Sequence, residues 1–349
     1  MRSESPIRHE QTYSLNEKVE FLRRPEVYPF ATYVDALETH MSWIFLTDQY
    51  VYKLKKPVYY DFLDFRILEA RYNYCMEEVR INQPLAGDTY LGIVALKIYQ
   101  GVMQLNGNGE TIDWLVKMKR LPEEYMLHNA IKEGNIRNEL IQQAAEMLAD
   151  FYVKSPPVGM APQQFKQYML KSIEQISTEL LRSEFKLQQF LITAITTDLV
   201  HFVVKQADLF DQRIADERII ECHGDLRPEH ICLAPDLVII DRIEFNKDLR
   251  IMDVAEELSF LALECEMLGS PATGQLFLNV YKEKSHDKLP DLLIFFYKAK
   301  RAFLRAKLSI HHLLEKGYQS GEQKWRSRCN NYLLAANAYC KQLQKKLEV

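Results

Sequence analysis

The sequence predicts an α+β fold in two lobes, a β-rich lobe over residues 1–120 and a mainly helical lobe over residues 121–349. In the first lobe, runs of β-branched and aromatic residues follow one another between turn signals, which is typical of strands. In the second lobe, apolar residues recur at the spacing of helices. The chain has 47% hydrophobic and 26% charged residues. These are ordinary values for a globular protein that can bury a sizeable core.

The N-terminal lobe is predicted to begin with a hairpin and a helix. The hairpin covers Trp43 to Lys55 and turns at Asp48-Gln49. Apolar side chains at helical spacing then predict a helix from about Phe65 to Leu85. A glycine-bearing turn at 106–109 separates two of the strands that follow. The three further strands are Tyr90–Tyr99, Val102–Leu105 and Trp114–Met118.

The C-terminal lobe is predicted to be helical apart from one β-rich interruption. The segment Ile219–Asp241 is predicted as strand, loop, strand, turn and strand, and helices resume near Asp253. A β-rich lobe followed by a helical lobe with one embedded hairpin is the order that a kinase-like fold produces. The helices before the interruption are Ile136–Val153, Gln164–Glu184 and Lys186–Phe210.

The strongest chemical signal is His223-Gly-Asp-Leu-Arg-Pro-Glu-His230, followed by Ile239-Ile-Asp241. Protein kinases place a catalytic-loop Asp five residues before a metal-binding Asn, and a second, metal-binding Asp further along. Asp225 precedes His230 by the same five positions, and Asp241 ends an apolar strand. One carboxylate orients the attacking hydroxyl, and the other holds the metal that neutralises the phosphate oxygens. The spacing therefore predicts Asp225 as the catalytic carboxylate and Asp241 as a Mg²⁺ ligand.

His230 stands where the kinase pattern has Asn, and two roles are open to it. As a metal ligand, its imidazole nitrogen suits Mn²⁺ better than the Mg²⁺ that an Asn oxygen prefers. Alternatively, it avoids the metal and hydrogen-bonds the catalytic loop, which would hold Asp225 in place. We treat His230 as a candidate metal ligand beside Asp241.

These residues resemble the aminoglycoside phosphotransferase superfamily, which includes choline kinase and fructosamine kinase relatives. The runs 223–233 and 239–262 are similar to an uncharacterised bacterial branch in which the domain is sometimes fused to a P-loop ATPase domain. The resemblance covers about Val19 to the C-terminus. It implies a two-lobed, protein-kinase-like fold, ATP as the phosphate donor and a small-molecule hydroxyl as the acceptor. No P-loop motif occurs in this chain, so such an ATPase partner would be encoded separately.

Lys53 is the candidate phosphate-binding lysine. In kinases a lysine late in an N-lobe strand pairs with a helix glutamate and binds the α- and β-phosphates. Lys53 and Lys55 share one face of the predicted strand, because side chains alternate with a period of two. The context Val51-Tyr-Lys53 and the resemblance favour Lys53, and the resemblance makes Glu78 its partner. Glu77 is the competitor, since only one of two adjacent residues can face the strand.

ATP is expected to lie between the lobes, against the connection 118–121, so Met118 and Arg120 are candidate nucleotide-binding residues. Kinases place glycines in the loop before the lysine strand so that backbone N–H groups can approach phosphates. The corresponding loop here, Thr39–Ser42, offers hydroxyls and amides but no glycine. An ordinary turn is an equally good interpretation of that loop.

Three other features are assigned supporting roles. Asp253 is expected to cap a helix, and the resemblance implies that it ties this helix to the catalytic loop. Glu244, three residues after Asp241, is a lesser candidate for a metal ligand. On the predicted helix 291–315, three cations lie opposite an apolar stripe, and they form either a solvated face or an anion site for a substrate's carboxylate or phosphate. These cations are Lys298, Arg301 and Arg305.

Composition and charge argue against several other classes of protein. The formal net charge of -4 disfavours broad nucleic-acid binding. The six cysteines form no C-x-x-C pair and, with the nearby histidines, fit no zinc template. Residues 1–11 lack a signal-peptide core, and no apolar stretch approaches the roughly 18 residues that a membrane span needs. We therefore expect a soluble cytoplasmic protein without nucleic-acid or membrane partners.

The sequence thus predicts a cytoplasmic ATP-dependent phosphotransferase that moves the γ-phosphate to an alcohol group of a small molecule, with Mg²⁺ or Mn²⁺. The main alternative is a nucleotide-binding regulatory module with little catalysis, because the phosphate loop lacks glycines and His230 replaces Asn. Transfer to a protein, or transfer of AMP, is a third interpretation. Nothing in the sequence identifies the acceptor as an aminoglycoside.

Overall fold

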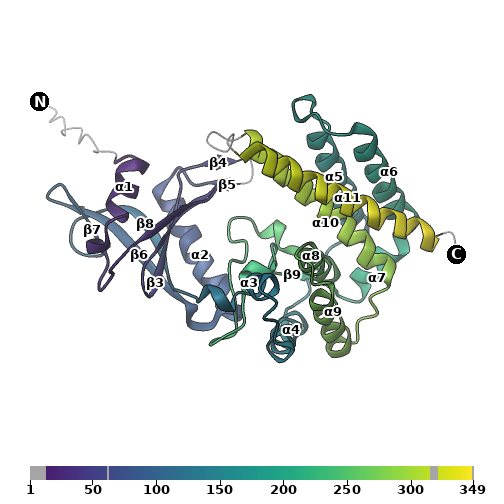
Figure 1. Cartoon of the computed structure of the whole chain (residues 1–349), viewed down its shortest axis with the longest axis horizontal. Helices are drawn as coiled ribbons and strands as arrows, with labels where there is room; N and C mark the ends of the chain where they lie inside the picture. The colour runs from purple at the N-terminus through teal and green to yellow at the C-terminus, as the bar shows by residue number, and fades with distance from the viewer. Residues whose placement is uncertain (1–12, 61–62, 315–320, 348–349) are drawn as a thin grey trace, which may run out of the picture. The chain divides into compact units, whose positions relative to one another are not determined.

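The computed structural model describes residues 13–60, 63–314 and 321–347, which fall into two units (Figure 1). Unit 1 comprises the chain up to Leu121 together with the short segment 244–246. Unit 2 comprises Pro122–Ile243 and the chain from Lys247 onward. Residues 1–11, in which no signal-peptide pattern was found, lie outside the described residues.

Unit 1 is built on a six-stranded antiparallel sheet with the strand order β1-β2-β3-β8-β6-β7. The predicted hairpin and the three further strands are confirmed. Strand β1 was not predicted, because its sequence, Asp-Ala-Leu-Glu, contains no β-branched or aromatic residue. The strands are β1 (Asp35–Glu38), β2 (Ser42–Leu46), β3 (Tyr50–Lys55), β6 (Tyr90–Tyr99), β7 (Val102–Leu105) and β8 (Glu110–Lys119), and a separate hairpin pairs β4 (Tyr59–Tyr60) with β5 (Leu63–Asp64).

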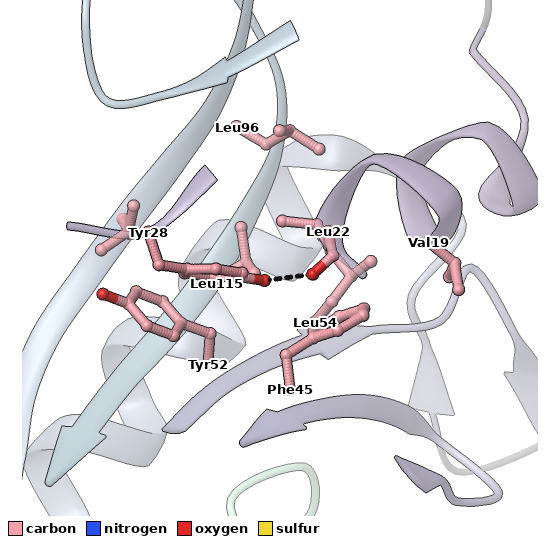
Figure 2. Packing of buried hydrophobic residues seen from close by; sticks show 9 residues of the cluster. Val19, Leu22, Tyr28, Phe45, Tyr52, Leu54, Leu96 and Leu115 are labelled. Carbon is pink, nitrogen blue, oxygen red and sulfur yellow. Dashed lines mark hydrogen bonds between the residues drawn. The ribbon is translucent and has the colours of Figure 1, made fainter. Parts of the chain in front are cut away.

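Helix α1 (Leu15–Leu22) covers one face of this sheet through an apolar cluster, which Figure 2 shows. The helix begins with a capping box, in which Ser14 and Glu17 each accept a hydrogen bond from the other's backbone N–H. The hydroxyl of Tyr28 donates to the Leu22 carbonyl at 2.7 Å and closes the cluster. Its members are Val19, Leu22, Tyr28, Phe45, Tyr52, Leu54, Val94, Leu96 and Leu115.

Helix α2 (Leu68–Ala86) covers the opposite face of the sheet. The side chains of β3 alternate, so that Leu54 belongs to the apolar cluster while Lys53 and Lys55 contact α2. The helix predicted from about Phe65 to Leu85 is therefore confirmed. The alternation of β3 decides which of its side chains meet the polar face of α2.

Unit 2 is mainly helical, and α8 packs against both α9 and α10, while α10 and α11 lie side by side (Figure 1). The helix predicted over 186–210 is broken in two at Gln206, whose φ of -106° and ψ of 33° lie outside the helical region. No Gly or Pro marks that position, so the sequence carries no signal for the break. The helices are α3 (Leu127–Lys132), α4 (Asn138–Lys154), α5 (Pro162–Leu180), α6 (Gln189–Lys205), α7 (Ala207–Ala215), α8 (Val254–Met267), α9 (Pro271–Ser285), α10 (Asp291–His311) and α11 (Glu322–Leu347).

Helix α10 ends at His311, and residue 315, where its end was predicted, lies outside the described residues. Among the helices that the structure describes, none alone has both the length and the apolar composition to cross a membrane. Helices α6 and α7, bent by 61°, would pass that test only as a pair.

Two short strand pairs interrupt the helices of unit 2. Strand β9 (Ile219–Glu221) pairs with β12 (Ile251–Asp253), and β10 (Ile231–Cys232) pairs with β11 (Val238–Ile239). The predicted interruption is confirmed, whereas β12 was missed because its three residues lead directly into α8. The loop between β9 and β10 carries the predicted catalytic motif and includes the short 3-10 helix η5 (Pro228–His230).

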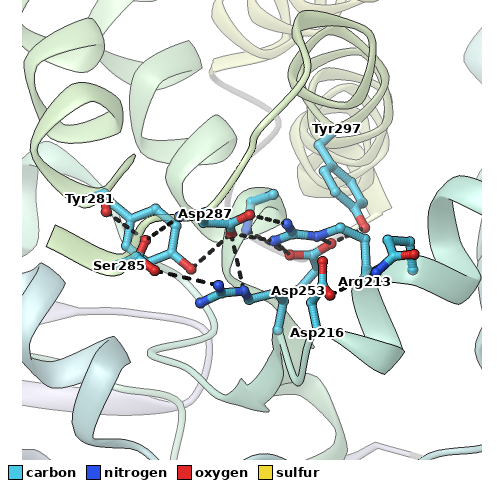
Figure 3. Close-up of polar contacts among 10 residues, drawn as sticks. Arg213, Asp216, Asp253, Tyr281, Ser285, Asp287 and Tyr297 are labelled. Atoms are coloured by element: carbon cyan, nitrogen blue, oxygen red, sulfur yellow. Dashed lines mark hydrogen bonds and ion pairs between the residues drawn. The ribbon is translucent and has the colours of Figure 1, made fainter. Parts of the chain in front are cut away.

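A buried ion network ties several helices of unit 2 together (Figure 3). Arg213 of α7 binds Asp253 at the start of α8, with distances of 2.7 and 2.9 Å. It also binds Asp287, which precedes α10, at 2.8 Å. The hydroxyls of Tyr297 and Tyr281 donate to Asp253 and Asp287 at 2.9 and 3.0 Å. Because each buried charge has partners, the network fixes these segments without leaving an isolated ion.

Candidate functional site

The carboxylate of Glu78 is buried on α2 and receives two lysines from β3. The Lys53 Nζ lies 2.9 Å from one carboxylate oxygen, and the Lys55 Nζ lies 2.6 Å from the other. Glu77 points elsewhere and pairs with Arg80 at 2.7 Å. The structure thus places Glu78, and not its neighbour, against the lysine strand. The phosphate-binding role of this pair stays a prediction.

The two lysines differ in exposure, and this separates their roles. The Lys53 side chain is 14% exposed, whereas that of Lys55 is completely buried. Lys55 also pairs with Glu244, from the segment that belongs to unit 1. Burial disfavours the ammonium form, but the carboxylates of Glu244 and Glu78 hold the pKa of Lys55 above its ordinary value. Sequence reasoning considered Glu244 for a metal, whereas the structure pairs it with Lys55 and leaves Lys53 accessible.

Met118 and Arg120 lie at the end of the sheet, and the contacts of Arg120 are made within unit 1. Met118 belongs to β8, beside β3. The Arg120 backbone N–H donates to the carbonyl of Gln49 at 2.8 Å. Its guanidinium donates to the hydroxyl of Tyr33 at 2.6 Å and to the carbonyl of Thr47 at 2.7 Å. These bonds hold the β2–β3 turn, and a contact of either residue with a nucleotide stays a prediction.

The loop Thr39–Ser42 is a tight turn between β1 and β2. The Thr39 backbone N–H donates to the carbonyl of Ser42 at 2.9 Å, and the Ser42 N–H donates to the Thr39 hydroxyl at 3.0 Å. These groups are therefore used inside the turn, which favours the interpretation as an ordinary turn over a phosphate-binding loop.

The loop that carries Asp225 is anchored from two sides in unit 2. Glu257, buried on α8, accepts hydrogen bonds from the backbone N–H of His223 at 2.9 Å and of Gly224 at 2.6 Å. The His223 Nε2 donates to the Ile240 carbonyl at 2.8 Å. Burial lowers the pKa of His223 to about 3, so its ring is neutral at ordinary pH. The histidine of the motif is therefore a structural residue that joins the loop to the next hairpin.

Asp225 presents a carboxylate that is 33% exposed and is held by Arg227. The Arg227 Nε donates to Asp225 Oδ2 at 3.0 Å, another of its nitrogens pairs with Glu229, and its Nη2 lies 3.1 Å from His230 Nε2. Burial raises the pKa of Asp225, but nearby positive charges, Arg227 foremost, hold it below its usual value. Asp225 is therefore ionised and oriented. Sequence reasoning missed Arg227, although its position two residues after Asp225 was visible.

His230 lies between the backbone of Asp225 and the carboxylate of Asp241. Its Nδ1 donates to the Asp225 carbonyl at 2.8 Å, and its Nε2 lies 3.6 Å from Asp241 Oδ2. Asp241 has a φ of +67°, a left-handed conformation that is uncommon outside glycine, and its side chain is 44% exposed. This backbone conformation directs the Asp241 carboxylate toward His230.

The donor set at this position suits a hard divalent ion only in part. Asp241 fits Mg²⁺ or Mn²⁺, because nucleotide sites hold such ions through one or two carboxylates plus phosphate oxygens. Among the described residues, no three or more His, Cys, Asp or Glu side chains form a group that could hold a metal alone. His230 fits less well, since its Nε2 accepts a hydrogen bond from Arg227. The geometry favours the loop-holding role, and direct metal binding by His230 stays a prediction.

No protein-family model matches the chain. The chain is 30% identical over 286 residues to an uncharacterized protein of Mycobacterium tuberculosis. This alignment covers 79% of this chain and 54% of that protein. The chain therefore spans about half the length of the curated relatives that it matches. A choline kinase from Cryptosporidium parvum superposes with a TM-score of 0.56 at 11% identity, covering 90% of each chain.

A choline/ethanolamine kinase family protein from Mesorhizobium loti superposes with a TM-score of 0.50 at 12% identity, covering 94% of this chain and 98% of that one. The protein has the kinase-like fold of the choline kinases. The predicted α+β, two-lobed architecture and the resemblance noted from the motifs are confirmed at the level of the fold. Such low identity shows the fold alone, so the chemistry depends on the site residues.

Within this kinase-like fold, α8 is tied to the catalytic loop by a residue that sequence reasoning did not single out. Asp253 caps α8 as predicted, because its side chain accepts from the Ala255 N–H at 2.9 Å. Its carboxylate otherwise binds Arg213 and the hydroxyl of Tyr297, so the predicted tie from Asp253 to the loop is wrong. Glu257, one turn further along the helix, makes that tie. The N-cap residue of α8 thus binds Arg213 of α7, and a residue in the first turn of the helix binds the loop.

Lys298 and Arg301 of α10 are buried, and the Arg305 side chain is only 12% exposed, so the interpretation of these cations as a solvated face is wrong. Acidic residues of α8 lie opposite and neutralise them, which a single sequence could not show. The pair between Arg305 and Glu264 is the longest of these ion pairs, with 3.6 Å between the Arg305 Nε and a carboxylate oxygen of Glu264. The closer ion pairs are Lys298 with Glu266, and Lys300 and Arg301 with Glu256, the last two at 2.7 Å.

Proposed function

We propose that this chain is an ATP-dependent phosphotransferase that moves the γ-phosphate of ATP to an alcohol group of a small molecule. The observation that carries the proposal is the catalytic loop, where an ionised and partly exposed Asp225 is oriented by Arg227. Asp241 follows on the next hairpin, beside His230. The kinase-like fold supports this proposal, since the similar structures named above are a choline kinase and a choline/ethanolamine kinase family protein.

Each of the proposed site residues would have a separate role. Asp225 would accept the proton of the acceptor hydroxyl as its oxygen attacks the γ-phosphorus and the bond to the β–γ bridging oxygen breaks, leaving ADP. Lys53, held by Glu78, would contact the phosphates, with Met118 and Arg120 near the nucleotide. Asp241 would hold Mg²⁺ or Mn²⁺, which neutralises phosphate oxygens when bound.

The test is a labelling experiment with γ-labelled ATP, a metabolite extract and the purified protein, with mass-spectrometric identification of the labelled product. Wild type is expected to label a small molecule. Asp225→Asn should retain ATP binding but lose transfer by about 10²–10⁴-fold, the usual contribution of a positioned base. Asp241→Asn should weaken metal-dependent ATP binding itself. Asp236→Asn, which removes an exposed carboxylate between β10 and β11, is the control.

Two results would redirect the assignment. If Asp225→Asn and Asp241→Asn behave alike in both binding and turnover, the division of roles between them is wrong. If wild type binds ATP but labels nothing in any extract, the protein is a nucleotide-binding regulatory module. That second candidate is favoured by one observation, the Thr39–Ser42 turn that uses its own amides.

The curated relatives that the chain matches are longer than this chain, and the branch that its motifs resemble includes fusions to a P-loop ATPase domain. We propose that a P-loop ATPase, encoded separately, associates with this chain. Co-purification of the full chain from its native cells, with Asp236→Asn as the neutral variant, tests this. Recovery of the chain without any P-loop protein would contradict it.

A further inference from the structure

Arg305 differs from its neighbour Arg301 on α10 in how completely it is paired. The Arg301 Nε lies 2.7 Å from Glu256, whereas the Arg305 Nε lies 3.6 Å from Glu264, which is beyond hydrogen-bond distance. The same Glu264 oxygen already accepts the hydroxyl of Tyr332 at 2.7 Å. Within the described part of the chain, the Nε atoms of both Arg301 and Arg305 lack a hydrogen-bond acceptor of good geometry, but only Arg301 has a carboxylate oxygen within 2.7 Å of its Nε. A buried donor without an acceptor lowers the stability of the folded state, so a ligand that accepts a hydrogen bond from Arg305 would bind favourably.

The position of Arg305 is next to the catalytic loop of unit 2. Helix α10 packs on α8, and α8 contacts η5 within that loop. The Arg305 guanidinium lies over the ring of Tyr332, with 5.6 Å to the centroid. Its positive charge helps to lower the pKa of both carboxyl groups of the loop, Asp225 and Glu229. A group bound to Arg305 would therefore lie close to the carboxylate that is proposed to activate the hydroxyl.

The acidic groups around Arg305 are already engaged. Glu229 is bound by Arg227, and Glu264 accepts from Tyr332. A cationic acceptor approaching Asp225 would consequently meet the guanidinium groups of Arg227 and Arg305. A carboxylate or phosphate would instead satisfy the Arg305 donors, because the planar guanidinium fork matches either anion.

We propose that Arg305 binds an anionic group of the acceptor, so that the enzyme phosphorylates the hydroxyl of an anionic small molecule, such as a hydroxy acid or a sugar phosphate. The inference rests on the proposed phosphotransferase function and names its substrate class. Of the two alternatives for α10, the inference favours the anion site, and it places that site at Arg305, because Lys298 and Arg301 have closer carboxylate partners than Arg305 has.

The first test measures binding without turnover. Inorganic phosphate and glycerate, which separate the phosphate and carboxylate cases, are titrated at constant ionic strength while the melting temperature is recorded. At least one anion should stabilise wild type. Arg305→Gln should raise its apparent Kd by about tenfold or more, as expected for a charged hydrogen bond, and Arg305→Lys should restore part of the affinity. Arg182→Gln, which removes an exposed arginine of the same unit, is the control.

An apparent Kd for both anions that is unchanged in Arg305→Gln would overturn the site. Arg305→Lys keeps the charge beside Glu264, so the comparison survives if the Gln variant folds poorly.

The second test measures ADP release with two panels of acceptors, glycerol 3-phosphate and glycerate against glucose, choline and kanamycin. Turnover should occur with the anionic panel, and Arg305→Gln should raise the acceptor KM about tenfold or more while leaving the KM for ATP unchanged. Turnover with neutral or cationic acceptors, insensitive to Arg305→Gln, would overturn the inference but leave the phosphotransferase. Arg305-dependent anion binding without any phosphoryl transfer would support the anion site and contradict the proposed function.

Discussion

His223 is kept neutral by its surroundings, and this makes the stability of the catalytic loop depend on pH. Its ring is completely buried, its Nε2 donates to Ile240, and burial lowers its pKa to about 3. In the unfolded chain a histidine titrates near about 6.5. Between these two pKa values the unfolded state binds a proton at His223 that the folded state does not bind. The contribution of His223 to the free energy of unfolding is therefore complete above about pH 6.5 and is lost as the pH falls toward 3.

We predict that the destabilisation caused by His223→Asn is smaller at pH 5 than at pH 7.5, by on the order of 1 kcal/mol. Urea unfolding of both proteins at the two pH values measures it. Comparison of the two proteins removes the opposing contribution of buried carboxyls such as Glu257, whose pKa is raised by burial. His201→Asn, at an exposed histidine of α6, is the control. An equal difference at both pH values would mean that His223 has the same pKa in the folded and the unfolded state, which would contradict the prediction.

Substitution of Lys55 is predicted to reduce the stability of the protein, whereas substitution of Lys53 is predicted to reduce ATP binding. Lys55→Met leaves Glu244 without its lysine in a buried site and should destabilise the protein by about 3–5 kcal/mol. Lys53→Met leaves Glu78 paired with Lys55, so the loss of stability should be much smaller. It should instead weaken ATP binding by at least about tenfold, the worth of one charged hydrogen bond. Chemical denaturation and ATP titration of both variants would show the reverse pattern if Lys55 is the phosphate ligand.

Residue types and spacing singled out Asp225 and Asp241, whose roles stay predictions, and the resemblance singled out the Lys53–Glu78 pair, whose contact the structure shows. They could not predict Glu257, because its role depends on which turn of α8 faces the loop. The burial of the α10 cations depends in the same way on what α8 places opposite them. Motifs identify groups that chemistry requires, whereas the residues that position those groups are chosen by packing.

At the scale of elements, the strands of unit 1 were predictable because their residues are β-branched, aromatic and separated by turn signals. The short β12 and the break at Gln206 were not, since each depends on tertiary packing and no Gly or Pro marks it. The start of α1 was available from the sequence, because Ser14 and Glu17 form a capping-box pattern. Local signals thus predict where elements begin better than where packing interrupts them.

The close contact between α8 and α9 gives a prediction at this scale. A Cβ at Gly274 would lie 2.5 Å from the Ala262 Cα, which is backbone and cannot move independently. Gly274→Ala should therefore destabilise by about 1–3 kcal/mol, although Ala is ordinarily the better helix residue. Gly159→Ala, where nothing lies within 4 Å, is the matched control and should be neutral or stabilising. If chemical denaturation shows the same change in the free energy of unfolding for the two variants, α8 and α9 can move apart at Gly274 without loss of stability, and the prediction is wrong.

At the scale of the whole molecule, the order of β-rich and helical segments predicted the kinase-like fold together with the motif around Asp225 and Asp241 and the resemblance that it carries. The similar structures confirm that fold at 11–12% identity. What the order could not show is that residues 244–246 belong with unit 1 although the chain around them belongs to unit 2. Glu244 in this segment pairs with the buried Lys55 of unit 1, although the two residues lie far apart in the sequence.

Nucleotide binding should be visible in the stability of the whole chain. A ligand that binds only the folded state stabilises it by RT ln(1 + [L]/Kd), or about 2.7 kcal/mol at 100 times the Kd. For domains of this size that corresponds to a rise in melting temperature of several degrees.

We predict such a rise for wild type with millimolar ATP and Mg²⁺ or Mn²⁺, its retention in Asp225→Asn and its loss in Asp241→Asn. The difference arises because Asp225 is proposed to act on the acceptor, whereas Asp241 is proposed to hold the metal that accompanies ATP. A scan with ATP and EDTA separates metal-dependent binding from binding of the nucleotide alone. An unchanged melting temperature of wild type with ATP and either metal would contradict the phosphotransferase and the regulatory module together.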